Sequence, residues 1–509
     1  MSVSVLFRDP ETSVPADVGA PAHFRDLNLD QLVADLASSR EEYALEPFLF
    51  LSLSSPEDVL YRQAVFADLE SARLRAATEA FAERMRDVRD VLAQARAMRA
   101  QLQRARLFAS AAAMYCEAVE SLRDDLAVAS PASDGLTNVS AYLTSLVAGD
   151  NHITLHRDAT HIEEALTAIT YTIHLRGSRV RVSSFGGEAD YSEAVRATFR
   201  KFEQADAPGR RSRFRELPEV DHVEGGILER VGQAFPDAFG ALTAFFSDRQ
   251  GFIDATVARF DREIQFYLAY LDYGDPLRSA GLSFCYPGVS ARPGEAAASG
   301  AFDLVLASKL TDDGQRVVCN DLALAEDERI LVVTGPNQGG KTTYARMIGQ
   351  LYYLASLGCP VPGTAATVPL PDRILTHFER QEDIETLSGK LQDDLTRIRQ
   401  ILGQATARSL IILNEIFTST TLADALALSE RILEHVTATD CRCVCVTFLD
   451  ELASFNDATV SMVASVTDGD PASRSFRLVR RRADGLAYAE AVADRYGLTY
   501  KQVRERVGS

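Results

Sequence analysis

Apolar residues recur at helical spacing through the first part of the chain. Residues 57–107 contain neither glycine nor proline and are rich in Ala, Leu, Arg and Glu, which are mostly strong helix formers. Apolar side chains every three or four positions form one face of a helix, with charged residues between them. We therefore expect residues 25–126 to be mainly helical. Residues 228–273 show the same helical pattern and predict a second long helical region.

Between these two regions the pattern changes several times. Residues 134–149 are rich in Ser, Thr, Asn and Gly, which predicts a loop. Residues 156–175 return to helical spacing, and the alternation of Arg and Val within residues 178–185 predicts a short strand. Residues 275–300 are rich in Pro, Gly, Ser and Ala and predict a linker.

From residue 302 onward, short apolar runs alternate with helical stretches. That alternation is typical of an α/β domain built on a mostly parallel sheet. The predicted fold class is therefore multidomain, with mainly helical parts over about the first 300 residues and an α/β domain after them.

Composition adds two constraints. The 509 residues are 46% hydrophobic and 25% charged, as in ordinary globular proteins. We find neither a signal peptide nor an apolar run of about 18 residues, so we expect no membrane span and a cytoplasmic location. The formal net charge of −19 argues against a surface that coats DNA non-specifically, although a local basic patch remains compatible with it.

Such a basic patch occurs between residues 199 and 215, where Arg and Lys alternate with Phe. Arg210, Arg211 and Arg213 are candidates for contacts to a DNA backbone. A solvated surface loop accounts for the same residues, and both interpretations stay open.

Three cysteines, Cys441, Cys443 and Cys445, alternate with other residues. Alternation places them on one face of a strand. Zinc sites usually space their thiols more widely, so we interpret these cysteines as small buried apolar residues.

A glycine-rich motif follows the apolar run that ends at residue 334. It fits G-x-x-x-x-G-K-[ST], lies between a predicted strand and a predicted helix, and is therefore interpreted as a P-loop for ATP. Its glycines let backbone N–H groups surround phosphate oxygens, its lysine faces the phosphates, and its first threonine offers a hydroxyl to Mg²⁺. The predicted nucleotide-binding residues here are Gly335, Pro336, Asn337, Gln338, Gly339, Gly340, Lys341, Thr342 and Thr343.

A second predicted strand, residues 409–413, has four consecutive apolar residues and is followed by Asn414 and Glu415. An acidic tip on such a strand is the Walker B pattern. Asn414 stands where an Asp usually binds Mg²⁺, and its carbonyl oxygen can still coordinate the ion. Glu415 is the candidate general base. A strand that merely ends in polar residues is the alternative.

Residues 387–392, LSGKLQ, are similar to the Leu-Ser-Gly-Gly-Gln signature of ABC ATPases. That signature contacts nucleotide bound to the opposite subunit, so Ser388 is a candidate nucleotide contact and a homodimer with composite sites is expected. A Ser-Gly turn that caps the following helix would have the same sequence.

Together these motifs resemble the MutS family. Residues 334–343, TGPNQGGKTT, resemble its TGPNMGGKST loop, and residues 357–362 resemble its IG-x-x-VPA segment. Residues 413–424 resemble its DEI-GRGTST-x-DG block, which adds Asp424 to the nucleotide-site residues. Residues 444–452 and 485–507 resemble the family's later segments.

The resemblance implies an ABC-related DNA-binding ATPase with a particular domain order. It predicts a short segment 1–25, a helical core and lever 26–127, a clamp-like region 128–225, a second lever helix and linker 226–300, and a P-loop ATPase domain 301–509. The implied cofactors are ATP and Mg²⁺, and the implied partners are DNA and a second copy of the chain.

Several residues depart from the family pattern. Asn414 stands in place of the family's acidic Walker B residue, and Phe448 stands in place of its switch histidine. The position of the family's adenine-stacking aromatic falls near Val317. Only about 25 residues precede the core-like helices, so we expect DNA binding without mismatch preference. Two alternatives stay open: a nucleotide-gated protein with little turnover, and an ABC-type ATPase acting on a protein partner.

Overall fold

The structure is a computed structural model that describes residues 2–12, 14, 18–176, 179–187, 222–379, 390–467, 470–483 and 502–504. Ser388 and the three arginines of the basic segment lie outside these residues. The described chain forms two compact units. The helical unit comprises residues 72–131 and 137–261, and the sheet unit comprises residues 2–71, 132–136 and 262–509. The domain boundaries suggested by the family resemblance stay predictions.

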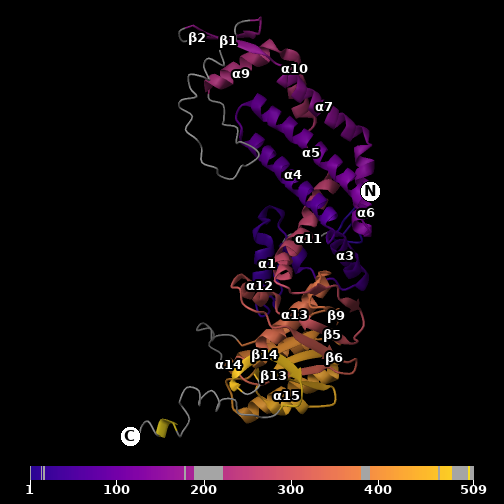
Figure 1. Cartoon of the computed structure of the whole chain (residues 1–509), viewed down its shortest axis with the longest axis vertical. Helices are drawn as coiled ribbons and strands as arrows, with labels where there is room; N and C mark the ends of the chain where they lie inside the picture. Colours follow the sequence, from indigo (N-terminus) through magenta and orange to yellow (C-terminus); the bar gives the residue numbers. More distant parts are fainter. Residues whose placement is uncertain are drawn as a thin grey trace. The chain divides into compact units, whose positions relative to one another are not determined.

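A long helical hairpin is the centre of the helical unit. Helices α4 (Ala72–Ala97) and α5 (Gln101–Ala129) are joined by three residues and pack side by side (Figure 1). Small buried side chains such as Ala112 on α5 allow close approach of its neighbours. The unit also contains α7 (Asp150–Thr167), α9 (His222–Ala234) and α10 (Pro236–Asp248), and α7 and α10 pack against α5.

The two predicted long helical regions are helical but interrupted. In the first, α3 (Pro56–Leu69) ends before α4 begins, and α5 follows after a further break. In the second, α9 ends where Pro236 starts α10, because proline fits the first turn of a helix and not its interior. The region closes with α11 (Ala255–Ser279).

The predicted loop at residues 134–149 is wrong, because α6 (Asp134–Val147) occupies it. Leu136, Val139 and Leu143 are spaced three and four residues apart, and all three are buried. Ser133 Oγ accepts a hydrogen bond from the Leu136 N–H at 3.3 Å and so caps the helix. Apolar periodicity therefore outweighs the polar composition of this segment.

The helix predicted for residues 156–175 ends too late. Helix α7 stops at Thr167, and β1 (Tyr171–Arg176) pairs antiparallel with β2 (Arg179–Ser184). The predicted strand at residues 178–185 is confirmed by β2. The apolar spacing of residues 171–175 fits either a helix end or a strand, and pairing with β2 decides for the strand.

The sheet unit is built on six strands in the order β10-β11-β12-β7-β13-β14. The strands run parallel except β14, which is antiparallel to β13. This confirms the mostly parallel α/β sheet predicted after residue 302. The strands are β7 (Ile330–Thr334), β10 (Ile374–Phe378), β11 (Leu410–Asn414), β12 (Arg442–Val446), β13 (Thr459–Thr467) and β14 (Asp470–Arg480).

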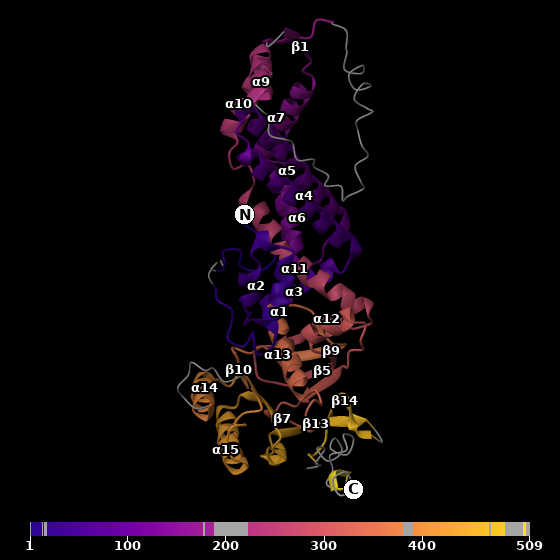
Figure 2. The ribbon, with the colours of Figure 1, turned by 90° about the vertical axis from the view of Figure 1, so that its left-hand side faces the viewer.

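Helices cover both faces of this sheet. On one face, α14 (Lys390–Gln404) and α15 (Leu422–Thr439), seen together in Figure 2, contribute to one apolar core. The three alternating cysteines are buried in that core, as predicted from their spacing. On the other face lies α13 (Lys341–Leu357), where a Cβ on Gly349 would meet Ile412 Cδ1 at 2.9 Å. Leu27 approaches the same position, with its Cδ2 at 2.6 Å, so a larger residue at 349 would have to displace both side chains.

The linker predicted for residues 275–300 is wrong. Helix α11 runs to Ser279, and the remainder contributes strands to two smaller sheets. Small residues that suggest a linker, such as Ala296 and Ala298, are here buried between strands. The first sheet pairs β3 (Phe284–Cys285) with β8 (Val361–Pro362), and the second has the order β4 (Gly288–Ser290), β9 (Ala365–Pro369), β5 (Ala296–Ala301) and β6 (Asn320–Leu324).

The N-terminal segment is part of the sheet unit's core. Glu263 Oε2 accepts hydrogen bonds from Ser4 Oγ at 2.7 Å and from the backbone N–H of Val5 at 2.8 Å. Arg62 is fully buried and donates to the carbonyl oxygens of Leu6 and of Leu357. The unit also includes α1 (Leu29–Ser38), η1 (Glu41–Tyr43), α2 (Glu46–Phe50), α12 (Leu304–Asp312) and η2 (Asp450–Ser454).

Within the described residues, no helix combines the length and apolar character needed to cross a membrane.

Candidate functional site

The glycine-rich motif forms the turn between β7 and α13. All five residues of β7 are buried, which fixes the start of the loop, and Gly340 is the N-cap of α13. Gly335, Gln338 and Gly340 have φ angles of 115°, 60° and 91°. Such left-handed conformations favour glycine and turn the backbone sharply. The first N–H groups of α13 have no partner within the helix, and residues 340–343 at the helix start line a cavity.

Two of the glycines are required because β13 lies against the loop. A Cβ on Gly335 would stand 3.0 Å from the Ala464 nitrogen on β13. One on Gly339 would stand 2.9 Å from the Pro336 oxygen of the loop and 3.0 Å from Ala464 Cβ on β13. Neither backbone atom can move aside as the end of a side chain could. Any larger residue at these two positions would push the loop away from β13.

Lys341 is buried and folded back onto its own loop. Its Nζ donates to the oxygens of Gly335 at 2.9 Å and Pro336 at 3.3 Å, and to Asn337 Oδ1 at 3.3 Å. Glu415 Oε1 lies 3.8 Å from the same nitrogen. The ammonium is thus stabilised by dipoles and one carboxylate, and a bound anion would offer it a stronger partner.

The first polar residues after β11 meet the start of α13. Thr342 Oγ1 donates to Asn414 Oδ1 at 3.0 Å, and Asn414 is buried at the strand's end. Glu415 has a φ of 52° and donates its N–H to the Val446 oxygen on β12 at 2.9 Å. This left-handed turn directs Glu415 away from the strand and toward the loop. The structure thus brings Lys341 together with these three residues.

These groups border a cavity of about 420 Å³, a size typical of small-molecule sites. One wall is polar and comes from the loop and from Glu415. The opposite wall comes from α12, from the segment before β6 and from β14. Burial raises the pKa of the Asp303 carboxyl, which caps α12. The lining residues are Asp303, Leu306, Ala307, Leu310, Gln315, Arg316, Val317, Val318, Asn320, Gln338, Gly339, Gly340, Lys341, Thr342, Thr343, Glu415 and Phe476.

Phe476 is a lining residue that sequence reasoning missed. It lies on β14 with a φ of 57°, and its side chain is 49% exposed. The Asn320 amide fixes this backbone, since it donates to the Phe476 oxygen at 3.1 Å and accepts from the Leu478 N–H at 2.8 Å. Val317, near which the resemblance to the MutS family places an adenine-stacking aromatic, lines the same cavity. Because residue 317 is aliphatic, the sequence does indicate that an aromatic ring for stacking on adenine would have to come from another position.

The other predicted residues lie around or away from the cavity. Gly335, Pro336 and Asn337 form the loop without lining it. Asp424 is in the first turn of α15, where its N–H donates to Thr421 Oγ1 at 3.2 Å and its carboxylate accepts from the same hydroxyl at 2.7 Å. Thr421 is therefore the N-cap of α15, and the Asp424 carboxylate accepts a hydrogen bond from the capping hydroxyl. Phe448 is 48% exposed and is not among the lining residues.

Comparison with known proteins finds relatives of the segment that contains this site. Residues 331–498 match the family model for MutS domain V. The chain is 29% identical over 187 residues to DNA mismatch repair protein MutS of Fervidobacterium nodosum, covering 36% of this chain and 22% of the relative. It is 32% identical over 185 residues to DNA mismatch repair protein MutS 2 of Halobacterium salinarum, covering 36% and 21%. The chain thus spans about a fifth of the length of these relatives.

Proposed function

Because residues 331–498 match the family model for MutS domain V, we propose that this protein is a DNA-binding ATPase. In this proposal ATP binding and hydrolysis at the glycine-loop cavity are coupled to movement of a clamp on DNA, in DNA repair or recombination. The relatives named DNA mismatch repair proteins support the DNA-related role.

One observation carries the proposal of a nucleotide site. Side chains from α13 and from the end of β11 converge at the polar wall of the cavity, and Lys341 lies beside them. The lysine now satisfies its charge with loop oxygens. Triphosphate oxygens would replace these partners, while the N–H groups at the start of α13 would bind the same anion.

The residues present also fit Mg²⁺. Thr342 Oγ1 and Asn414 Oδ1 lie 3.0 Å apart, and both are oxygen donors of the kind that Mg²⁺ prefers. When bound, the ion would neutralise charge on the β- and γ-phosphates. Asn414 contributes no charge, so phosphates would supply most of the electrostatic attraction for the ion.

Glu415 is the proposed general base. It lines the cavity, and its Oε1 lies 3.8 Å from Lys341 Nζ. In that place it would hold an attacking water by accepting its proton. The ion pair with Lys341 would give way when phosphates take the lysine.

The remaining roles extend this site to the dimer and to DNA. Ser388 and Asp424 are proposed to contact nucleotide in a homodimer with composite sites, and Arg210, Arg211 and Arg213 to contact the DNA backbone. The core, lever and clamp boundaries given above belong to the same proposal.

A second candidate function is a nucleotide-gated binding protein with little turnover. The neutral Asn414 and the aromatic Phe448 favour it, because both replace polar groups of the family's site. A third, action on a protein partner without DNA, is favoured by the net charge of −19.

Steady-state ATP hydrolysis with and without DNA separates these functions. DNA-stimulated hydrolysis supports the proposal, tight ATP binding without turnover supports the second function, and turnover indifferent to DNA supports the third. The Lys341→Ala variant is the control for contaminating ATPase, and turnover equal to that of the unmodified protein would reject the assigned site.

A further inference from the structure

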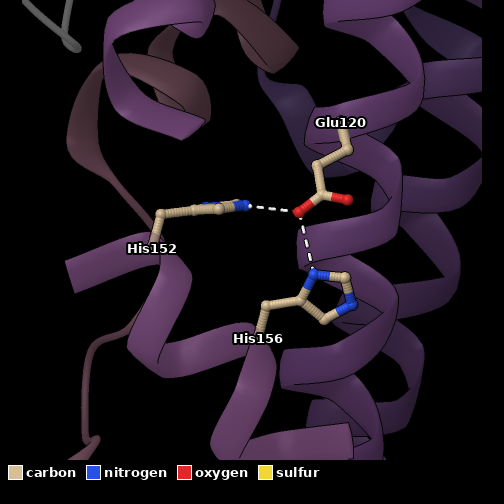
Figure 3. A group of neighbouring side chains, drawn as sticks. All are labelled: Glu120, His152 and His156. Atoms are coloured by element: carbon tan, nitrogen blue, oxygen red, sulfur yellow. Dashed lines mark hydrogen bonds and ion pairs between the residues drawn. The ribbon is translucent and has the colours of Figure 1, made fainter. Parts of the chain in front are cut away.

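Three metal-ligating side chains meet in the helical unit, outside the proposed nucleotide site. Glu120 projects from α5, and His152 and His156 project from α7 toward it (Figure 3). Glu120 Oε1 lies 3.1 Å from His152 Nε2 and 2.8 Å from His156 Nδ1. We propose that these residues bind a divalent transition-metal ion, which links α7 to α5. The kinds of donor atom indicate that the ion is zinc.

Helix geometry places the two imidazoles side by side. His152 and His156 are four residues apart, so they project from the same face of α7 about one turn apart. Leu155, Ala159 and Ile162 are buried residues of α7 that hold the helix in place. A separate hydrogen bond, from Ser110 Oγ on α5 to Glu163 Oε1 at 2.8 Å, supports the same register between the helices. The ligands therefore come from a packed pair of helices.

The spacing of the donor atoms suits a zinc ion. Zn–N and Zn–O bonds of about 2.0–2.2 Å in a tetrahedron separate neighbouring ligand atoms by about 3.3–3.5 Å. The two separations from Glu120 are 2.8 and 3.1 Å, and all three ligand atoms lie within 4.8 Å of one another. Binding of the ion would therefore require the carboxylate to move outward by a few tenths of an ångström and the imidazoles to adjust around the metal.

The kinds of donor select the kind of metal. Two imidazoles and one carboxylate suit zinc and its neighbours in the first transition row. Calcium and magnesium instead require six or more oxygen ligands, or several retained waters, and rarely use imidazole. Among the described residues, this is the one group of three or more His, Cys, Asp and Glu side chains gathered closely enough to bind an ion.

The site is accessible to an ion and to water. The His152 side chain is 3% exposed, whereas those of His156 and Glu120 are 31% and 29% exposed. One ligand is thus anchored in the core while the other two border solvent. Three protein ligands leave a fourth tetrahedral position, which water can fill.

Metal titration of the full-length, untagged and chelator-treated protein tests the proposal. Zn²⁺ binding is followed by calorimetry, and Co²⁺ binding by its visible absorption, which reports imidazole coordination and geometry. We expect one equivalent of each metal and a rise in the melting temperature with Zn²⁺. His156→Ala and Glu120→Gln should each weaken binding by at least about tenfold, or ~1.4 kcal/mol.

Matched controls make the result specific. His161→Ala removes another imidazole from α7, one that is exposed and outside the group, and should keep full metal binding. His156 and Glu120 are partly exposed, so their variants report on the ion even where replacement of the buried His152 harms folding. Circular dichroism of each variant checks this directly.

The alternative is a hydrogen-bonded clasp in which Glu120 accepts from both imidazoles and no metal is involved. Absence of a stoichiometric equivalent, or equal affinity in the unmodified protein and the His156→Ala variant, would establish that alternative and overturn the proposal. The Lys341→Ala variant should bind metal normally, which separates this test from the proposed ATPase function.

Discussion

Lys341 is a buried cation whose ammonium group contacts oxygens of its own loop and could contact phosphate oxygens instead. We expect Lys341→Ala to weaken ATP binding by at least about 100-fold, or ~2.7 kcal/mol, because the phosphates lose their nearest charge. Calorimetric titration with ATP measures this loss. Lys309→Ala is the matched control, since that exposed lysine on α12 donates to Gln31 and is absent from the cavity wall. Equal ATP affinity in the Lys341 variant and the unmodified protein would refute the P-loop assignment.

Glu415 and Asn414 test the chemistry separately from binding. Glu415→Gln should bind ATP normally and lose hydrolysis by about 100-fold or more, because the amide cannot accept a proton from water. Asn414→Asp should lower the Mg²⁺ concentration needed for half-maximal hydrolysis, since it adds a charge beside Thr342. Single-turnover hydrolysis across Mg²⁺ concentrations measures both. If neither variant differs from the unmodified protein, the Walker B assignment is wrong.

Phe476 offers an exposed ring beside the loop. We expect Phe476→Ala to weaken ATP binding by about tenfold or more, because stacking of a base on an aromatic ring contributes roughly 1–3 kcal/mol. Inorganic triphosphate carries no base, so its affinity should stay unchanged. Phe448→Ala provides a control that removes a similarly exposed ring outside the cavity lining. Parallel losses for ATP and triphosphate would mean that Phe476 supports the loop and does not contact the base.

At the scale of elements, periodicity predicts more than composition does. The mostly parallel sheet and the buried face of the three alternating cysteines follow from apolar runs and alternation, and both are present. Helix α6 and strand β5 were missed because their small and polar residues are common in loops. Burial of Ala296 depends on strands distant in sequence, β6 and β9, which local patterns cannot reveal.

Candidate-site residues follow the same division. The loop and the end of β11 are contiguous motifs, so their residues could be identified directly. Phe476 reaches the cavity only because β14 pairs with β13 and because the Asn320 side chain hydrogen-bonds to the backbone of β14. The metal group is also non-local, because its carboxylate lies 32 residues before the first histidine. Sequence spacing shows the histidine pair and leaves its third ligand unidentified.

Helix α6 yields a stability prediction. Leu143→Ala should destabilise the protein by about 2–5 kcal/mol, because the side chain is buried and leaves a cavity. Thr144→Ala on the exposed side should change stability by less than about 0.5 kcal/mol. Chemical denaturation followed by circular dichroism measures both. A similar small effect at the two positions would argue that residues 134–149 do not form a packed helix in solution.

At the scale of the whole molecule, net charge and DNA binding must be reconciled. If a local basic segment contacts phosphates, replacing Arg210, Arg211 and Arg213 by Glu should weaken binding to all DNA sequences. Each lost phosphate contact reduces the magnitude of the slope of log affinity against log salt by about 0.9, so the loss of three contacts reduces it by ~2.7. Fluorescence anisotropy at several salt concentrations measures the slope. An unchanged slope would favour the solvated-loop interpretation of this segment.

The buried N-terminal segment also bears on the order of events during synthesis. Ser4 leaves the ribosome 259 residues before Glu263, whose carboxylate accepts its hydrogen bond, and Arg62 precedes its acceptor Leu357 by 295 residues. At about 5–20 residues per second, these partners appear on the order of tens of seconds later. Until then the apolar side chains of Val5 and Leu6 and the guanidinium of Arg62 lack their native surroundings. The nascent chain therefore exposes a short apolar segment for that time, and the sheet unit can enclose it only late in translation.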